Sequence, residues 1–438
     1  MLNEQLGVAA NFAVHQTVAN RRAAGADILD LSFGESLLPV HPSLVERLAQ
    51  GSVDTDYGPI AGDGAARAAA AGYFARRGLP TDPDQIVFAP GSKPLLLAVV
   101  AAVDGDVMLP SPTWVSYAPQ ARLLGRAAFP VPTPSHCGGV PDPDALRLAV
   151  RAARARRGRP RLVVLTLPDN PSGTLAPPAV VRRVCEVALA EGLTVVSDEI
   201  YRDLAHDGAP PLLSPAEVIP ERTVVVTGLS KSHGIGGWRI GLARFPRGRH
   251  GAALRAGVVA AASEIWSTLA RPMQAVAELA LSEPPEIRAH LAAAARLHGT
   301  VAAAVHEVIT AAGARCLPPQ GGFYLYPDLE GIRDVLADKG VTTAADLQDH
   351  LLDRHGIAVL GGHLFGDKPR ALRVRIATSL LYGDTPKQRW QTLHAADPLS
   401  LPHVRKAVDR IGAAFRALSS PARCSAGGRL VETAERGA

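Results

Sequence analysis

The chain has 438 residues, of which 47% are hydrophobic and 20% charged, a composition typical of a globular protein with one or two large domains. Its 46 basic and 41 acidic residues leave a formal net charge of +5. The one dense basic stretch, RAARARRGRPR at residues 151–161, follows a helical pattern and contains no aromatic residue. We therefore interpret it as the exposed end of a surface helix and expect no nucleic-acid partner.

Cysteine spacing and hydropathy exclude an obvious metal-binding motif and a membrane span. The four cysteines form no C-x-x-C motif, so we predict free thiols and no bound metal: Cys137, Cys185, Cys316 and Cys424. The longest apolar run, residues 95–103, is about half of what spans a bilayer. The first 25 residues lack the basic and apolar regions of a signal peptide. We expect a cytoplasmic protein without membrane contact.

The first two thirds of the chain alternate between helical and strand patterns. A helical segment reaches Arg22, and a short strand follows in ADILDLSF. Further helices are predicted at 65–78, 94–103, 118–125 and 178–192, and further strands at 85–90, 106–112, 161–167, 194–201 and 223–228. The strands are continuous Val/Leu runs without polar alternation, which indicates that both of their faces are buried. This pattern predicts an α/β fold with a mostly parallel sheet sandwiched by helices.

After about residue 275 the pattern changes to that of a smaller α+β domain. Its longest predicted helix covers 291–313, and short strands are expected within 321–329, 357–362 and 371–379. We predict a large domain at 46–274 and a small domain at 275–418, which the N-terminal segment 1–45 joins. The Gly/Ser/Ala-rich residues 419–438 are expected to be a disordered tail.

Polar and aromatic residues follow several predicted strands, at the sheet edge where ligands of parallel sheets bind. Ser92 and Lys93 come after a strand and open a helix, so their backbone N–H groups suit a phosphate. Trp114, Asn170, Asp198 and Tyr201 follow later strands. Core packing or an ordinary turn explains Trp114 or Asn170 alone, but a carboxylate at the end of an apolar strand is costly unless it pairs with a cation.

Lys231 follows the last of these strands, in GLSKSHGIGGWRIG at residues 228–241. Ser230 precedes it and Arg239 comes eight positions later. Phosphate donors, an aromatic face, an amide, a carboxylate and a lysine at one sheet edge fit a pyridoxal phosphate site. In such a site the lysine holds the cofactor aldehyde as a Schiff base, and the carboxylate pairs with the ring nitrogen.

Seven motifs together resemble the class I/II aminotransferase (aspartate aminotransferase-like) family of fold type I pyridoxal-phosphate enzymes. In chain order they are YGPIAG, GSK, PTWVSY, DNPSGT, SDEIY, SKSHGIGGWRIG and RVRIATS, within about residues 27–380. The resemblance implies a homodimeric aminotransferase that moves an amino group from an L-amino acid to a 2-oxo acid. The cofactor it implies is pyridoxal 5'-phosphate.

The resemblance also implies a role for each matching residue. Lys231 would form the Schiff base and move the substrate's α-proton, Asp198 would keep the ring nitrogen protonated, and Tyr201 and Asn170 would bind the ring 3'-oxygen. Trp114 would stack on the ring. The phosphate would be held by Ser92, Lys93, Ser230 and Arg239 and, from the neighbouring subunit, by Tyr57. Gly34 and Arg375 would bind the substrate carboxylate.

Three points stay open. Arg373 alternates with Arg375 on one strand and is the second candidate for the carboxylate. The Lys93 side chain either reaches a distal substrate carboxylate or is solvated. The loop at residues 36–38 departs from the family pattern beside the substrate, so elimination or replacement, decarboxylation, cyclisation and oxidation by the same cofactor remain alternatives to transamination.

Overall fold

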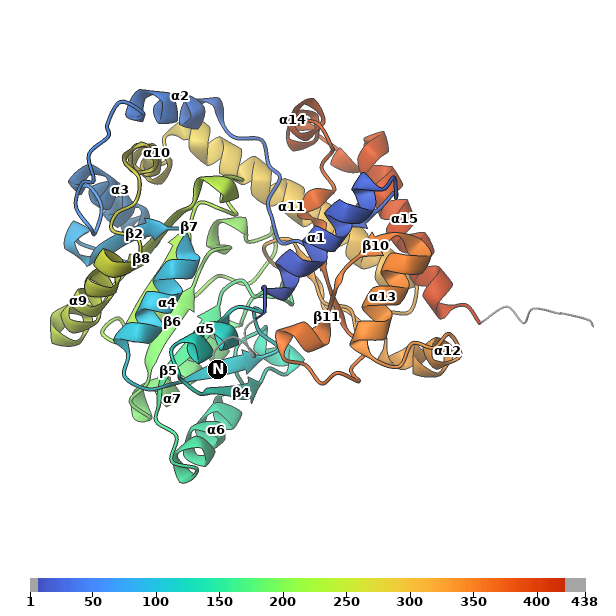
Figure 1. Ribbon diagram of the computed structural model, residues 1–438, viewed down its shortest axis with the longest axis horizontal. Coiled ribbons are helices and arrows are strands. Elements are labelled where there is room, and N and C mark those ends of the chain that lie inside the picture. The colour runs from blue at the N-terminus through green and yellow to red at the C-terminus, as the bar shows by residue number, and fades with distance from the viewer. Residues whose placement is uncertain (1–6, 422–438) are drawn as a thin grey trace, which may run out of the picture.

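A seven-stranded sheet forms the core of the larger part of the molecule in the computed structural model, which describes residues 7–421 (Figure 1). The strand order is β2-β8-β7-β6-β5-β3-β4. The strands are β2 (Ile86–Pro90), β3 (Asp106–Ser111), β4 (Ala128–Pro132), β5 (Pro160–Thr166), β6 (Thr194–Asp198), β7 (Thr223–Gly228) and β8 (Ile240–Arg244). Neighbours run parallel, except that β8 is antiparallel to β2 and β7. The predicted mostly parallel α/β sheet is confirmed.

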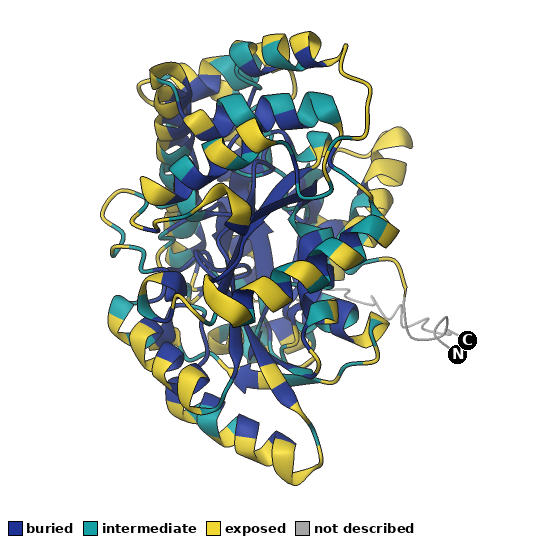
Figure 2. Ribbon diagram, turned by 90° about the vertical axis from the view of Figure 1, so that its left-hand side faces the viewer, coloured by how far each residue is buried: buried dark blue, intermediate teal, exposed yellow. Residues whose placement is uncertain are grey.

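Strand β5 illustrates why the strands have no polar alternation. Leu162 and Val164 pack under α4 (Ser92–Ala102) and α9 (Gly248–Ile265), whereas Val163 and Leu165 pack under α6 (Pro143–Ala155) and α7 (Pro178–Ala190). Each buried side chain of this size contributes about 1.5–3 kcal/mol relative to exposure. Figure 2 shows the buried strands between helices whose outer faces are exposed.

The sequence patterns missed β4 and β8. Strand β4 reads AFPVP, and its two prolines are tolerated because it is the edge strand of the sheet. Strand β8 follows the glycine-rich turn after Lys231 and returns antiparallel between β2 and β7.

A second group of elements lies beside the sheet and is built mainly from the C-terminal third of the chain. It contains an antiparallel sheet of order β11-β12-β9 and a parallel pair, β1-β10. The strands are β1 (Leu29–Asp30), β9 (Tyr324–Leu325), β10 (Ile357–Ala358), β11 (Leu360–Gly361) and β12 (Val374–Ala377). The helices of this group are α11 (Pro285–Ala311), α12 (Arg333–Ala337), α13 (Ala344–His355), α14 (Pro386–His394) and α15 (Pro402–Ser419).

The N-terminal segment packs on this second group. Helix α1 (Ala10–Ala23) lies beside the C-terminal helices in Figure 1, and its Arg21 forms an ion pair with Asp353 on α13 at 2.6 Å. Val18 of α1 is buried against Leu352 and Ala358. The remaining helices accompany the large sheet: α2 (Pro42–Gly51), α3 (Gly64–Ala75), α5 (Tyr117–Leu123), α8 (Pro215–Val218) and α10 (Arg271–Ser282).

Two predictions from the sequence concern the C-terminal tail and the absence of a membrane-spanning helix. Helix α15 includes Ser419, where the disordered tail was predicted to begin, and residues 422–438 lie outside the described part. Among residues 7–421, no helix has the length and apolar character needed to cross a membrane.

Candidate active site

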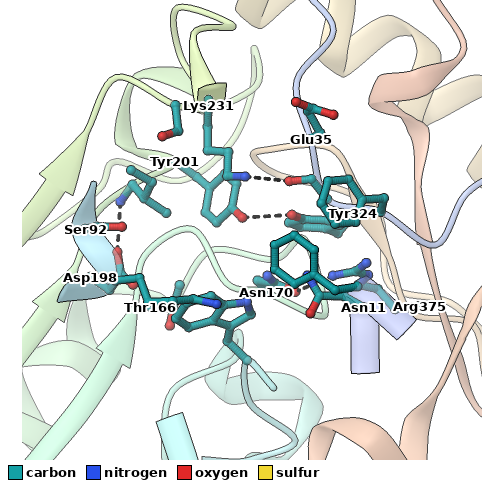
Figure 3. A pocket seen from close by; sticks show the side chains of 18 of the residues that line it. Asn11, Glu35, Ser92, Thr166, Asn170, Asp198, Tyr201, Lys231, Tyr324 and Arg375 are labelled. Carbon is teal, nitrogen blue, oxygen red and sulfur yellow. Dashed lines mark hydrogen bonds between the residues drawn. The ribbon is translucent and has the colours of Figure 1, made fainter. Parts of the chain in front are cut away.

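A pocket of about 490 Å³ lies at the carboxyl ends of β5, β6 and β7, between the large sheet and the second group of elements (Figure 3). It brings together most of the residues singled out in the sequence: Gly34, Ser92, Lys93, Trp114, Asn170, Asp198, Tyr201, Ser230, Lys231, Arg239 and Arg375. Tyr57 is not among the lining residues, and 81% of it is exposed.

Lys231 reaches into the pocket from the turn after β7. Its Nζ donates a hydrogen bond to the backbone oxygen of Gly34 at 2.5 Å. Burial lowers the pKa of Lys231 to about 8, although the Glu35 carboxylate opposes this change. About a tenth of the amine is then uncharged at neutral pH, and only the uncharged amine is a nucleophile.

Asp198 ends β6 and is buried beneath the pocket. It accepts hydrogen bonds from the Tyr117 hydroxyl at 2.7 Å and from the Ile200 backbone N–H at 3.3 Å. Burial raises the pKa of Asp198 to about 6, although these hydrogen bonds oppose the rise. Within residues 7–421 the carboxylate forms no ion pair, although the charge of Lys231 also opposes the rise of its pKa. A buried carboxylate without a cation suits a ligand that supplies one.

Tyr201 and Asn170 face the pocket from the loops after β6 and β5. The Tyr201 hydroxyl lies 2.8 Å from the Tyr324 hydroxyl on β9. The Asn170 side-chain oxygen accepts from Arg375 at 3.5 Å, which leaves the amide N–H groups of Asn170 free to donate. Both side chains are buried, so their positions are fixed by packing.

The structure separates the two candidate arginines. Arg375 is buried on β12, donates to the backbone oxygen of Ser32 and lines the pocket, and its Nε has no hydrogen-bond partner among the described residues. Arg373 instead pairs with Asp328 at 3.0 Å and with Asp367 at 3.2 Å and does not line the pocket. Arg375 is therefore the arginine placed to bind a ligand carboxylate.

The start of α4 forms a cradle for an anion. The first backbone N–H groups of a helix, here from Ser92 onward, lack helical acceptors and carry partial positive charge. Gly91 precedes them with a φ of +94°, and a Cβ there would overlap the guanidinium of Arg239. Arg239 adopts a left-handed φ of 56°, and its guanidinium donates to the Gly236 oxygen. Glycine thus allows the helix start and the arginine to approach one ligand.

Lys93 and Trp114 line the mouth of the cradle. The Lys93 ammonium lies 5.3 Å from the Trp114 ring centroid and 5.5 Å from that of Phe12 on α1. Burial, and then Arg239, lower the pKa of Lys93. The side chain therefore faces the pocket in addition to contributing its backbone.

The sequence patterns missed several lining residues. They are Asn11, Phe12, His15, Phe33, Glu35, Tyr117, Thr166 and Tyr324. Tyr117 closes the motif SPTWVSY and Thr166 ends β5, so their positions in the chain could have indicated them. The α1 residues and Tyr324 belong to a helix and a strand whose patterns carry no such signal.

Comparison with known proteins identifies the family. The sequence matches aminotransferase class I and II over residues 26–380. It is 30% identical over 389 residues to an aspartate aminotransferase of Geobacillus stearothermophilus, covering 87% of this chain and 94% of that protein. It is 31% identical to an arginine–pyruvate transaminase of Pseudomonas aeruginosa, covering 82% and 87%.

Solved structures agree. The aspartate aminotransferase of Thermus thermophilus with maleate superposes with a TM-score of 0.79 at 26% identity, covering 94% of this chain and 98% of that one. The enzyme from Rhizobium meliloti gives 0.80 at 25% identity, with the same coverage. The chain therefore belongs to the class I and II aminotransferase family.

Proposed function

We propose that the pocket is the active site of this aminotransferase and that it binds pyridoxal 5'-phosphate through Lys231. The observation that carries the proposal is the convergence of a lysine of lowered pKa, a buried carboxylate without a cation and a helix N-terminus with an arginine. These groups match an aldehyde, a ring nitrogen and a phosphate. When bound, the cofactor supplies an electron sink for the α-carbon of an amino acid.

The pocket residues would divide the work between cofactor binding and proton transfer. The Nζ of Lys231 would hold the cofactor covalently and, when free, would take and return the proton at the substrate's α-carbon. The Asp198 carboxylate would favour a proton on the ring nitrogen. Tyr201 and Asn170 would donate to the ring oxygen, and Trp114 would cover a ring face.

The phosphate and the substrate would bind at opposite ends of the pocket. The backbone N–H groups of Ser92 and Lys93, together with Ser230 and Arg239, would hold the phosphate. Arg375 would bind the α-carboxylate of an L-amino acid or a 2-oxo acid as a bidentate partner, while Gly34 would let the backbone approach it.

The assembly is proposed to be a homodimer with shared sites. Tyr57 is exposed outside its own pocket, on a segment held by the ion pair of Asp56 with Arg271, so it is free to reach a neighbouring subunit. Mixed dimers of Tyr57→Ala and Lys231→Ala subunits should then be more active than either parent, because one site per dimer is complete. An activity of the mixture equal to the mean of the two parents would exclude sharing.

Two further proposals concern the division into domains and the cellular compartment of the protein. The sequence predicts a large domain at 46–274 and a small domain at 275–418, with 1–45 joined to the latter, and largely separate hydrophobic clusters support two domains. Val276, Ala280 and Ile287 pack in the core of the large domain, which favours a boundary within α11 rather than at residue 275. Cys137 and Cys185 are buried free thiols, which fits a reducing compartment such as the cytoplasm. Limited proteolysis between the domains tests the first statement, and fractionation of cells tests the second.

The absorbance of the bound cofactor tests the site. Wild-type protein reconstituted with pyridoxal phosphate should show a visible band that Lys231→Ala abolishes. The control Lys368→Ala changes an exposed lysine outside the pocket and should keep the band. A band that survives Lys231→Ala would show that another lysine is the attachment point.

The products test the reaction. The holoenzyme is mixed with a panel of amino acids, first without and then with a 2-oxo acid, while the spectrum is followed. Transamination predicts an amine form of the cofactor that the 2-oxo acid converts back. Release of ammonia, CO₂ or H₂O₂ without a 2-oxo acid would contradict it.

A further inference from the structure

We propose that Tyr324 is a positioning residue whose hydroxyl donates to Tyr201 and whose ring orients Arg375, so that one side chain couples the two ends of the active site. The inference rests on the proposed function, in which Tyr201 binds the cofactor's ring oxygen and Arg375 binds the substrate carboxylate. Tyr324 lies on β9, far along the chain from Tyr201, and faces the pocket (Figure 3).

The first contact is the pair of hydroxyl groups. Tyr201 and Tyr324 lie 2.8 Å apart at their oxygens, and their rings meet edge to face with centroids 5.4 Å apart. Both side chains are buried, and burial raises the pKa of each phenol, so both keep their protons near neutral pH. Two protons are therefore available, and the bond between the oxygens uses one of them.

The proposed ligand of Tyr201 sets the direction of that hydrogen bond. The ring oxygen of pyridoxal phosphate would carry negative charge and be a stronger acceptor than a neutral phenol. With the cofactor bound, Tyr201 would donate to that oxygen and would accept a hydrogen bond from Tyr324. A donor that is itself a hydrogen-bond acceptor is polarised and binds more strongly. Tyr324 therefore strengthens the donation from Tyr201 without touching the cofactor's oxygen itself.

Gly34 leaves the space that Tyr324 needs. A Cβ on Gly34 would overlap the Tyr324 hydroxyl, and the backbone oxygen of the same glycine accepts from Lys231. The absence of a side chain at position 34 thus keeps the hydroxyl beside Tyr201. Three segments that are distant in the chain meet at this point.

The second contact is between the Tyr324 ring and Arg375. The guanidinium lies 4.7 Å from the Tyr324 ring centroid and 5.2 Å from that of Phe365. Aromatic rings attract a guanidinium over their faces, and an arginine held in this way loses less freedom when it binds a carboxylate. The ring, independently of its hydroxyl, is therefore expected to set the affinity for the substrate carboxylate.

Tyr324→Phe tests the hydroxyl through the spectrum of the bound cofactor. A weaker donation from Tyr201 stabilises the ring-oxygen anion less, so the pKa of the cofactor–Lys231 linkage, read from the visible band against pH, should rise by about 0.5 unit. The other charged groups facing the pair, Lys231, Asp198, Glu35 and Arg375, are unchanged. An unchanged or lowered pKa would overturn the proposed direction.

Tyr326→Phe is the matched control. Its hydroxyl donates to Asp367 at 2.8 Å, outside the pocket, so removal of this hydroxyl should leave the spectral pKa unchanged. A double-mutant cycle adds the causal step. In a Tyr201→Phe background, Tyr324→Phe should cause no further shift, because Tyr324 acts through Tyr201. An equal shift in both backgrounds would contradict this role.

Tyr324→Leu tests the ring through binding. The KM for an amino acid should rise about tenfold in Tyr324→Leu but stay within about twofold of wild type in Tyr324→Phe, which keeps the ring. Equal KM values in both variants would overturn the coupling to Arg375. Failure of the proposed function is distinct, because the wild type would then show no band that depends on Lys231.

Discussion

One wall of the pocket consists of the loops that follow β2, β3, β5, β6 and β7, whereas the opposite wall comes from α1, the segment around Gly34, β9 and β12. The first wall carries the groups assigned to the cofactor, and one sheet fixes their relative positions. The second wall carries Arg375 and Tyr324 and depends on how separate elements pack. The sheet therefore sets the cofactor chemistry, and the packing of the second wall sets the selection of substrates.

The largest effect is expected from a change in the first wall, which carries the groups assigned to the cofactor. Asp198→Asn keeps the shape of the side chain but removes the charge that holds a proton on the ring nitrogen, so kcat/KM should fall about 1000-fold. Steady-state kinetics of the reconstituted enzyme measure the loss. Asp207→Asn changes an exposed carboxylate near the same loop and serves as control. A loss of less than about tenfold would remove Asp198 from the proposed role.

The next largest effect is expected from Arg375 in the second wall, where a change should affect substrate binding and not cofactor attachment. Arg375→Gln removes a bidentate charged partner of the substrate and should raise KM about 50-fold, while the visible band of the cofactor bound to Lys231 is retained. Arg373→Gln, two residues away, breaks the half-exposed ion pairs with Asp328 and Asp367. It should leave KM within about twofold and lower Tm by roughly 1–2 °C. The reverse pattern would transfer the carboxylate role to Arg373.

A smaller effect concerns the phosphate cradle. Gly91→Ala places a Cβ against the guanidinium of Arg239 and strains a φ of +94°, so the affinity for pyridoxal phosphate should fall about tenfold. Gly125→Ala has a comparable positive φ of +66° but no atom within 4 Å of the added Cβ. It should lower stability without changing cofactor affinity. Equal affinity in both variants would argue against the cradle.

The smallest effect lies where the two walls meet. Asp169 is buried in the turn whose Gly173 oxygen accepts from Gln320 near β9, and burial raises its pKa to about 7. The folded state then holds a proton that the unfolded chain loses near pH 4, so stability falls as pH rises from about 4 to 7. Asp169→Asn should raise Tm by about 2 °C at pH 8 and change it little at pH 4. Thermal melts at both pH values check this, and an equal change at both would contradict it.

The cofactor side of the pocket could be predicted from sequence because each of its groups follows a strand. Parallel strands end at the same edge of a sheet, so Asn170, Asp198 and Lys231 had to lie near one another. The seven motifs, taken in order, then indicated the family. The sequence patterns did not predict the proline-containing strand β4 and the antiparallel strand β8, because neither has the continuous apolar pattern of a central parallel strand.

The substrate side could not be predicted in the same way. Arg373 and Arg375 have the same neighbours in sequence, and the acidic partners Asp328 and Asp367 that hold Arg373 outside the pocket come from other segments. Phe12 and Asn11 lie on a helix whose pattern gives no reason to expect them beside Trp114. The sequence predicted Tyr324 only as part of a short strand and indicated no role for it in the site.

The sequence by itself determined the α/β sheet, the order of the strand-end groups and the family, because hydrophobic periodicity and local motifs act over a few residues. The tertiary structure decided which arginine faces the pocket, that α1 closes one side of it, and that Tyr324 meets Tyr201 and Arg375. These contacts join segments far apart in the chain, and their geometry depends on the packing of whole elements. No local pattern encodes that packing.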